Sequence, residues 1–377
     1  MERAKILQVI TLLGSGGSYG GPLRVAFEIA EELNRKGHLP SIVGGVISSR
    51  DFPTSAKVLT SGIKVRPISK KLNVSSLFSL KVPSRLWSEI RQSDVVHIHF
   101  GRDLIPITAT LICILNKKSF YLQTHGMVKK DNRKLVRFVD QLLVKGIFKK
   151  ANAVFALQSE ELSELRKLGF EARYEILPNG ILIDEEIDLT YKAASFVAVF
   201  CARLAPVKQV DRFLEIAKRA SIDELDATFE IFGPDGGQLA KVLDFIAENE
   251  LEKTLRYGGT VDPLEVPRLL ARKSLLVLPS RYDPFPVSIL ESLGVGTPVL
   301  VNESCGISDV IKNLDNHFVS ERDDSSNFYD AFLYLYENPV DQHQRIAIQK
   351  FTSENFSIKN VVEDLIRMYD KWNFKEP

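Results

Sequence analysis

The stretch Ser280–Pro298, SRYDPFPVSILESLGVGTP, carries the densest group of residues suited to chemistry in this chain. Asp283 and Glu291 are eight residues apart, about two helical turns, so a helix over Val287–Leu293 would place both at one end face. Carboxylates at a strand end and on a helix, together with the amides of the helix start, can hydrogen-bond a polyhydroxylated ring. Gly294, Gly296 and Pro298 then predict a tight turn from helix to strand. The stretch therefore predicts a strand–loop–helix–strand unit with a polar binding loop.

Outward from this stretch, short apolar runs alternate with amphipathic helical patterns, which predicts mostly parallel sheets covered on both faces. The expected strands of the second half are Phe196–Cys201, Ala227–Phe232, Leu275–Pro279 and Pro298–Val301. Those of the first half are Lys5–Leu13, Ser41–Ile47, Val95–Phe100, Phe120–Thr124, Ala153–Ala156 and Glu175–Leu177. Leu104–Leu115 is too short to span a bilayer and predicts a buried helix, and Ile358–Tyr369 predicts an amphipathic one.

The acidic, turn-rich stretch Pro178–Ser195 separates the two series, so we expect two doubly wound α/β domains with an interdomain cleft. The expected boundaries are 1–185, 186–355 and a C-terminal helix, 356–377, that packs back toward the first domain. In such sheets, ligands bind at the carboxyl ends of the strands.

The charge of the chain divides at the same place. The 377 residues have 49 Lys and Arg against 48 Asp and Glu, yet residues 1–180 carry 28 basic and 15 acidic side chains. A basic half joined to an acidic half suggests an anionic partner for the first half only.

A composition of 45% hydrophobic and 26% charged residues excludes a disordered, fibrous or polytopic membrane protein. The three cysteines, Cys113, Cys201 and Cys305, lie too far apart in sequence to indicate a disulfide framework or a zinc site.

A glycine-rich loop, GSGGSYGG at 14–21, follows the first expected strand. No Gly-Lys-Ser/Thr follows, so it is not a P-loop. Ser48, Ser49 and Arg50 stand where a dinucleotide fingerprint requires an acid. An anion- or sugar-facing role is favoured over a flexible turn.

Three histidines lie at or near strand ends. His125, in QTHGM, is expected to turn its ring toward the carboxyl edge of the sheet. His97 and His99 alternate along VVHIHF without a carboxylate cluster, so a structural role is favoured over metal binding for both.

Arg203 and Lys208, in ARLAPVKQVDRFL, follow the first strand of the second half. Two cations at the carboxyl edge of an otherwise acidic domain suit a diphosphate. The alternative is solvated loop charge.

Taken together, these segments resemble the retaining glycosyltransferases of the GT-B fold, the group 1 or family 4 type, which use nucleotide sugars. Ser280–Pro298 is similar to the Glu-x7-Glu signature of that family. Support comes from further segments in the expected order: Gly-Gly-Pro at 20–22, THG at 124–126, LPNGI at 177–181, ARLAPVK at 202–208, FEIFGPDGG at 229–237 and YGGTV at 257–261.

The resemblance implies roles for individual residues. His125 would face the transferred sugar, Arg203 and Lys208 would bind the leaving diphosphate, and Asp283 would contact sugar hydroxyls as a fourth catalytic residue. The donor-binding residues would be Gly20, Gly21, Gly233, Gly259 in a YGGTV loop, the amides of Phe285, Val287 and Ser288, and Glu291 at the ribose. Asp283 replaces the first Glu of the signature, and Pro286 replaces a Gly and has no N–H to donate.

The resemblance further implies hexosyl transfer from a UDP- or GDP-linked sugar to a glycan or lipid-linked acceptor, with retention of configuration and without a metal or other cofactor. The alternatives are a nucleotide-sugar 2-epimerase and a non-catalytic sugar-nucleotide-binding subunit. Nucleic-acid binding is not expected, since no recognised module accompanies the basic half.

For location, the N-terminus lacks a signal peptide pattern, so the cytoplasm is expected. Basic residues near apolar ones in the first half suggest peripheral contact with anionic lipid at the inner face of the cell membrane. They are Lys129, Lys130, Arg133, Lys134, Arg137, Lys145, Lys149 and Lys150, with Lys70, Lys71 and Lys81 near Phe78, Leu80 and Trp87. A merely soluble basic face is the alternative.

Overall fold

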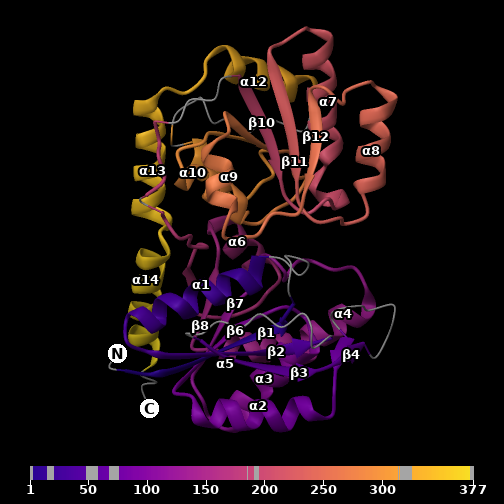
Figure 1. The fold of residues 1–377 in the computed structure, drawn as a ribbon. Coiled ribbons are helices and arrows are strands. Elements are labelled where there is room, and N and C mark those ends of the chain that lie inside the picture. The colour runs from indigo at the N-terminus through magenta and orange to yellow at the C-terminus, as the bar shows by residue number, and fades with distance from the viewer. Residues whose placement is uncertain are drawn as a thin grey trace. The chain divides into compact units, whose positions relative to one another are not determined.

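A computed structural model describes residues 3–14, 21–47, 58–67, 76–184, 186–190, 195–312, 314 and 325–373. The described chain forms two compact units (Figure 1). Unit 1 contains the residues up to Gly180 and those from Ile358 onward, and unit 2 contains Ile181–Ser357. The chain therefore leaves the first unit five residues before the expected boundary, and the C-terminal helix belongs to unit 1. At the crossing, Ile181 N donates to Phe356 O at 2.9 Å.

Unit 1 is built on a seven-stranded parallel sheet in the order β3-β2-β1-β6-β7-β8-β9. Its strands are β1 (Lys5–Leu12), β2 (Leu39–Val46), β3 (Leu59–Lys64), β6 (Val95–His99), β7 (Phe120–Gln123), β8 (Ala153–Ala156) and β9 (Tyr174–Ile176). A short antiparallel pair, β4 (Arg66–Pro67) with β5 (Leu77–Phe78), lies outside this sheet. The strand order reverses between β1 and β6, which makes their carboxyl ends the switch point where ligands bind in such sheets.

Helices cover both faces of the unit 1 sheet because side chains of β1 alternate between two cores. Leu7 and Val9 pack with α2 (Lys81–Gln92) and α3 (Leu104–Leu115), whereas Ile10 packs with α1 (Gly21–Arg35). Figure 1 shows α1 on one side of the sheet and α2 and α3 on the other. The remaining helices of this part are α4 (Lys134–Val139), the π-helical turn η3 (Asp140–Val144), α5 (Lys145–Lys150) and α6 (Ser159–Lys167).

The C-terminal helix α14 (Ile358–Asn373) is tied to unit 1 by buried polar contacts. The Tyr369 hydroxyl lies 2.6 Å from Nδ1 of His97, and Tyr121 donates to the Tyr369 carbonyl at 3.0 Å. Trp372 donates to Glu175 at 2.9 Å. This amphipathic helix thus completes the core of unit 1.

Unit 2 is built on a five-stranded parallel sheet in the order β12-β11-β10-β13-β14. The strands are β10 (Phe196–Cys201), β11 (Ala227–Phe232), β12 (Leu255–Gly259), β13 (Leu275–Leu278) and β14 (Val299–Val301). The helices are η4 (Pro206–Lys208, 3-10), α7 (Val210–Ile222), α8 (Leu239–Glu248), α9 (Val266–Ala271), α10 (Val287–Gly294), α11 (Ser308–Lys312), α12 (Ser325–Glu337) and α13 (Gln342–Phe356). The order reverses between β10 and β13, so the switch point lies at the loops after those two strands.

The two parallel α/β sheets confirm the predicted fold class. The YGGTV segment is the exception in local structure, because residues up to Gly259 form the edge strand β12 instead of a loop. Only Leu255 of this strand is buried, and Arg256 on it pairs with Glu230 of β11 at 2.6 Å.

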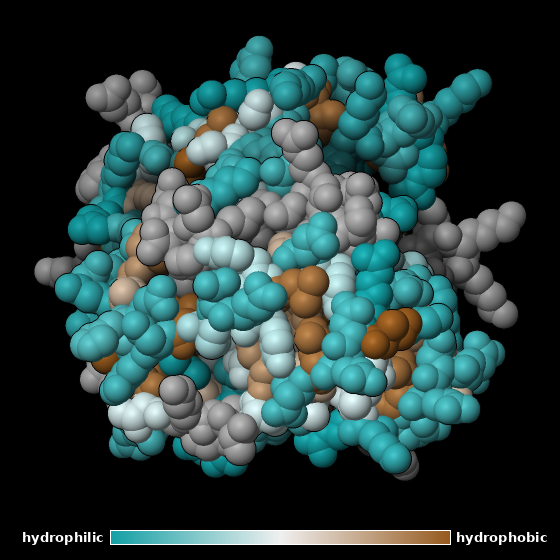
Figure 2. All heavy atoms as spheres, turned by 90° about the horizontal axis from the view of Figure 1, so that it is seen from above, coloured by the Kyte–Doolittle hydropathy of each residue, from teal (hydrophilic) through white to brown (hydrophobic). Residues whose placement is uncertain are grey.

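Figure 2 shows the hydropathy of the residues on one face of the molecule. Hydrophilic side chains predominate there, and hydrophobic ones form separate patches. Within the described residues, no helix has both the length and the hydropathy that a bilayer crossing needs.

Candidate functional site

The unit 2 switch point brings together two residues that are 75 positions apart in sequence. Lys208 ends η4 in the loop after β10, and Asp283 lies in the loop after β13. Their side chains form a direct ion pair between Nζ and Oδ2, and both are mostly buried. Because β10 pairs with β13, the loops that follow them are neighbours. Both residues were predicted as separate contacts, and the structure makes them one cluster.

The backbone holds this cluster from both sides. Gln209, after Lys208, has a left-handed φ of 49°, which ends η4 and starts α7. Asp283 O accepts from Gly306 N at 2.8 Å, next to the buried Cys305. A positive φ such as that of Gln209 is uncommon for a residue other than glycine and often marks a functional segment.

Helix α10 begins directly after the Asp283 loop, with Pro286 as N-cap and Val287 as its first residue. The first-turn amides of a helix have no intrahelical acceptor and carry partial positive charge. The amides of Val287 and Ser288 therefore belong to a helix start that suits an anion or a sugar oxygen. The prediction of a helix over this segment is confirmed.

Two other predicted residues of the segment are buried. Phe285 packs its ring against Phe356 at a centroid distance of 5.8 Å, so its side chain has a structural role and only its amide remains as a candidate contact. Glu291 lies on α10 and is 3% exposed. Its carboxylate stands in the interior of unit 2, which leaves the predicted ribose contact untested.

The loops after β10 and β11 touch closely beside this cluster. Gly233 has φ of 141°, and a Cβ built on it would lie 2.0 Å from the Ala202 carbonyl oxygen. Its N–H donates to Gly259 O at 2.8 Å, and its carbonyl accepts from the Tyr257 hydroxyl at 2.9 Å. Only glycine allows this approach, so Gly233 sets the position of the Arg203 loop.

The predicted cation Arg203 is exposed in this loop. A cavity of about 370 Å³ lies along the same edge and is lined by Pro206, Val207, Gln209, Val210, Asp211, Gln238 and Arg281. These residues come from the loop after β10 and from the segments that follow β11 and β13. This edge of unit 2 therefore offers a ligand bound at the Lys208–Asp283 pair both the exposed cation Arg203 and a cavity.

The unit 1 site is centred on His125, just after β7. Its φ is 50°, and Gly126 follows at 67°, so the backbone makes a left-handed turn at the strand end. His125 is buried, and burial together with the neighbouring His97 lowers its pKa to about 3. The ring is therefore neutral at physiological pH.

Glu161, on α6, holds this turn and was not singled out by the sequence. One carboxylate oxygen accepts from the Thr124 hydroxyl and from Gly126 N, both at 2.5 Å. The other accepts from Leu157 N at 2.7 Å. Burial raises the pKa of Glu161, although these three donors act in the opposite direction. No local pattern distinguishes this glutamate from an ordinary acidic residue in a first helical turn.

We expect Glu161→Ala to lower the free energy of unfolding of unit 1 by about 3 kcal/mol, because three buried donors lose their acceptor. Chemical denaturation followed by circular dichroism measures this change. Glu160→Ala is the matched control, since Glu160 is exposed in the same helical turn, and we expect it to change stability by less than about 0.5 kcal/mol. Equal effects of the two substitutions would contradict the role given to Glu161.

His97 and His99 occupy different environments. His97 bridges the Tyr369 hydroxyl and Oε1 of Gln123, at 2.6 and 3.1 Å, which is a structural role. His99 instead contacts His125, with 2.6 Å between Nδ1 and Nε2. Among the described residues, no group of three potential ligands could hold a metal ion.

The glycine-rich loop is only partly described. Gly20 lies outside the described residues. Gly21 starts α1 and is exposed, with open space where a Cβ would be. Its expected approach to a ligand stays a prediction.

Two Rossmann-like units, each with polar residues at its switch point, are typical of the GT-B glycosyltransferases, which use nucleotide sugars. Solved structures support the fold over the whole chain. An Anabaena protein, HepE, crystallised with UDP-glucose, gives a TM-score of 0.74 at 15% identity, covering 98% of this chain and 100% of that one. The pneumococcal O-GlcNAc transferase GtfA, crystallised with UDP and GlcNAc, gives 0.76 at 12% identity with full coverage of both.

Family comparisons agree with the fold. Residues 19–185 match the model described as Glycosyltransferase Family 4, and residues 186–351 match that of Glycosyl transferases group 1. The chain therefore belongs to the glycosyltransferases of the group 1 or family 4 type. Among curated relatives, an Escherichia coli UDP-Gal:alpha-D-GlcNAc-diphosphoundecaprenol alpha-1,3-galactosyltransferase is 26% identical over 293 residues, which are 71% of this chain and 73% of the relative.

Proposed function

We propose that this chain transfers a hexosyl group from a UDP- or GDP-linked sugar to a hydroxyl of a glycan or lipid-linked acceptor, with retention of anomeric configuration. The observation that carries the proposal is the Lys208–Asp283 pair at the unit 2 switch point, beside the start of α10. It offers a cation for a diphosphate and a carboxylate for a sugar hydroxyl within one cluster. UDP is favoured over GDP because the Escherichia coli relative is named for UDP-Gal and the Anabaena structure contains UDP-glucose.

In the proposed reaction, the bond between the anomeric carbon and the phosphate oxygen breaks, and a bond from that carbon to the acceptor oxygen forms on the same face. The proton of the acceptor hydroxyl passes to the leaving diphosphate. Lys208 and Arg203 stabilise the negative charge that develops on the diphosphate. Asp283 accepts a hydrogen bond from a sugar hydroxyl through the carboxylate that Lys208 also holds.

The test uses purified protein, radiolabelled UDP-hexoses and a lipid diphosphate carrying GlcNAc. We expect acceptor-dependent release of UDP and a labelled lipid whose new linkage has the anomeric configuration of the donor. Free epimerised sugar formed without acceptor would instead identify an epimerase. Donor binding with no UDP release would identify a non-catalytic subunit.

We propose that this reaction needs no divalent metal, because Arg203 and Lys208 can supply the positive charge that a metal ion provides in other enzymes. Addition of EDTA is expected to leave the turnover number unchanged within about twofold. The control is the same assay after dialysis with Mg²⁺ restored. Activity that disappears with EDTA and returns with Mg²⁺ would contradict this proposal.

We further propose that unit 1 contacts an anionic bilayer surface through a stripe of exposed apolar residues on α4 and η3. Leu135, Phe138 and Leu142 are 64%, 62% and 69% exposed and recur at helical spacing. Exposed basic residues surround the stripe: Lys130, Arg133, Lys134 and Arg137. An apolar stripe flanked by cations suits the boundary between headgroups and acyl chains of anionic lipid. Of the other expected basic residues, Lys70 and Lys71 lie outside the described residues.

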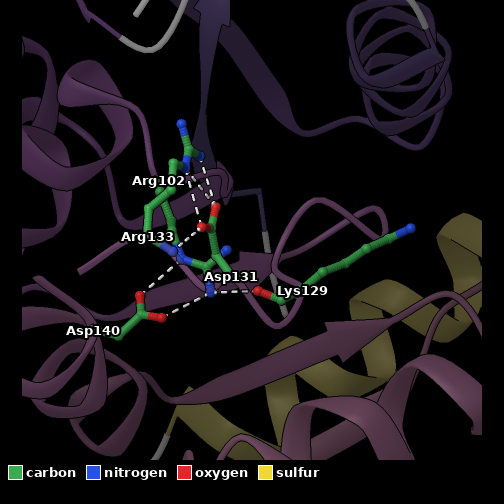
Figure 3. Close-up of polar contacts among 5 residues, drawn as sticks. All are labelled: Arg102, Lys129, Asp131, Arg133 and Asp140. Carbon is green, nitrogen blue, oxygen red and sulfur yellow. Dashed lines mark hydrogen bonds and ion pairs between the residues drawn. The ribbon is translucent and has the colours of Figure 1, made fainter. Parts of the chain in front are cut away.

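Salt bridges fix the segment that presents this stripe (Figure 3). Arg102 makes a two-pronged pair with Asp140, at 2.7 and 2.9 Å, and also donates to the Lys129 carbonyl at 2.8 Å. Arg133 pairs with Asp131 in the same loop. The loop before α4 and the start of η3, which flank α4, are therefore held together.

Phe138→Ser is expected to weaken binding to phosphatidylglycerol vesicles about tenfold, because one large apolar side chain no longer leaves water. Co-sedimentation at low ionic strength measures the binding. Ile222→Ser is the matched control, since Ile222 is 68% exposed on unit 2, and we expect no change. Equal binding of the wild type to neutral and anionic vesicles, or none to either, would contradict the proposal.

A further inference from the structure

His125 stands at the end of a chain of hydrogen bonds that begins on α1. The amide nitrogen of Gln8 donates to the carbonyl of Ala26 at 2.9 Å. Oε1 of Gln8 lies 2.8 Å from Nε2 of His99, and Nδ1 of His99 lies 2.6 Å from Nε2 of His125. The planes of the two rings differ by only 11°, which suits an in-plane hydrogen bond between their nitrogens.

The direction of every hydrogen bond in this chain follows from its first member. A backbone carbonyl can only accept, so the amide nitrogen of Gln8 faces Ala26 and its oxygen faces His99. His99 must therefore donate from Nε2. A neutral imidazole has one donor and one acceptor, so Nδ1 of His99 accepts and His125 donates from Nε2.

Both rings are held neutral by their surroundings. Burial lowers the pKa of His99 well below its usual value, and the nearby His97 and His125 act in the same direction. Burial and His97 lower that of His125 to about 3. With its proton on Nε2, neutral His125 keeps a lone pair on Nδ1, and this atom has no hydrogen-bond partner among the described residues.

The position of this chain in the fold links it to ligand binding. Gln8 lies on β1 and His99 ends β6, the two strands between which the order of the unit 1 sheet reverses. His125 follows the neighbouring strand β7 in a left-handed turn that Glu161 holds. Ligands bind at this edge of doubly wound sheets.

We propose that Gln8 and His99 are positioning residues that hold His125 as the Nε2–H tautomer, so that its Nδ1 accepts a hydrogen bond from a substrate hydroxyl. The proposal rests on the glycosyltransferase function proposed above and deepens it. A phosphate oxygen at physiological pH is an acceptor and would be repelled by the Nδ1 lone pair. His125 consequently selects a sugar or acceptor hydroxyl and not the diphosphate.

The test records long-range ¹H–¹⁵N correlation spectra of histidine-labelled protein, which report the protonated nitrogen of each ring. We expect His125 to carry its proton on Nε2 in the wild type. In Gln8→Met, His99 loses its acceptor and can donate from Nδ1, so the proton of His125 is expected to move to Nδ1. A wild-type spectrum with the proton on Nδ1 would overturn the proposal without any variant.

Two variants at position 99 complete the test. His99→Asn places an amide oxygen near the position of Nδ1 and is expected to keep the wild-type tautomer of His125, whereas His99→Leu removes the acceptor and is expected to lose it. His97→Asn is the control, since His97 makes no hydrogen bond to His125, and the tautomer should stay. An unchanged tautomer in both His99→Leu and Gln8→Met would overturn the relay.

Activity measurements distinguish a failure of this proposal from a failure of the proposed glycosyltransferase function. We expect Gln8→Met and His99→Leu to lower kcat about tenfold, because one hydrogen bond between neutral groups of His125 and the substrate is lost. The Kd for UDP should be unchanged. His99→Asn should recover most of the loss. Wild-type protein that shows the expected tautomer but transfers no sugar would contradict the proposed function and leave the relay standing. A kcat loss in Gln8→Met without a tautomer change would contradict the relay alone.

Discussion

Lys208→Ala is expected to lower the turnover number of hexosyl transfer about 10³-fold, the largest effect of any single substitution proposed here. The side chain supplies positive charge at the unit 2 switch point, where the leaving diphosphate is expected. It also pairs with Asp283, which is 9% exposed and would keep a nearly buried charge without its partner. Steady-state kinetics with a UDP-hexose and acceptor measure the effect.

Two further variants show which property of Lys208 matters. Asp283→Asn keeps the size of the side chain and removes its charge, while Lys208 remains in place. We therefore expect it to lower the turnover number less than Lys208→Ala does. Lys350→Ala breaks an exposed pair with Glu354 on α13, 4.0 Å in length, in the same unit, and should leave turnover unchanged. If Lys208→Ala retained more than about a tenth of wild-type turnover, the assignment of Lys208 to the leaving group would be wrong.

Gly233→Ala is expected to destabilise unit 2 by about 3 kcal/mol or more, and to lower its melting temperature by about 10 °C. The new Cβ would lie 2.0 Å from Ala202 O and 2.6 Å from Ala202 C, and φ of 141° is unfavourable for alanine. Neither backbone can move easily. Gly233 N is bonded to Gly259 O, and Ala202 N to Phe232 O at 3.0 Å. Differential scanning calorimetry measures the change.

Gly237→Ala is the matched control for this prediction. Gly237 also has a positive φ, 97°, but an added Cβ would meet no atom within 4 Å. It therefore carries the conformational cost alone, about 1 kcal/mol. If the two substitutions destabilised the protein equally, the close contact between the loops after β10 and β11 would not be the reason for glycine at 233.

Much of the fold follows from local sequence pattern. The bounds of β8, β10 and β11 agree with the predicted strands, because each is a short, mostly apolar run in which most residues are buried. The helix Leu104–Leu115 is also found at its predicted bounds. Short apolar runs of this kind indicate buried segments. In a protein with parallel sheets, strands buried on both faces have this sequence pattern.

What the sequence could not supply depends on contacts between distant residues. β12 was missed because only Leu255 in it is buried and two of its five residues, Gly258 and Gly259, are glycines, which are depleted in strands. The pairing of Lys208 with Asp283 depends on β10 and β13 being neighbours, which only the strand order shows. Knowledge of the doubly wound order would have been enough to expect it.

The polar groups behind His125 were harder still to predict. Gln8 lies in the middle of an apolar strand, 91 residues before His99, and Glu161 is 35 residues after Gly126. Each looks ordinary within its own segment. Their role appears only when the sheet brings β1, β6 and β7 together, since parallel pairing fixes which side chains meet.

Nucleotide binding tests the central claim most directly. A thermal-shift screen of the 377-residue chain against UDP, GDP, ADP and their sugars reports affinity through ligand linkage. We predict that UDP or a UDP-hexose raises the melting temperature, with a smaller or no effect of ADP, and that Lys208→Ala removes the shift while Lys350→Ala keeps it. No stabilisation by any nucleotide or nucleotide sugar would contradict the account of this chain as a nucleotide-sugar-dependent glycosyltransferase.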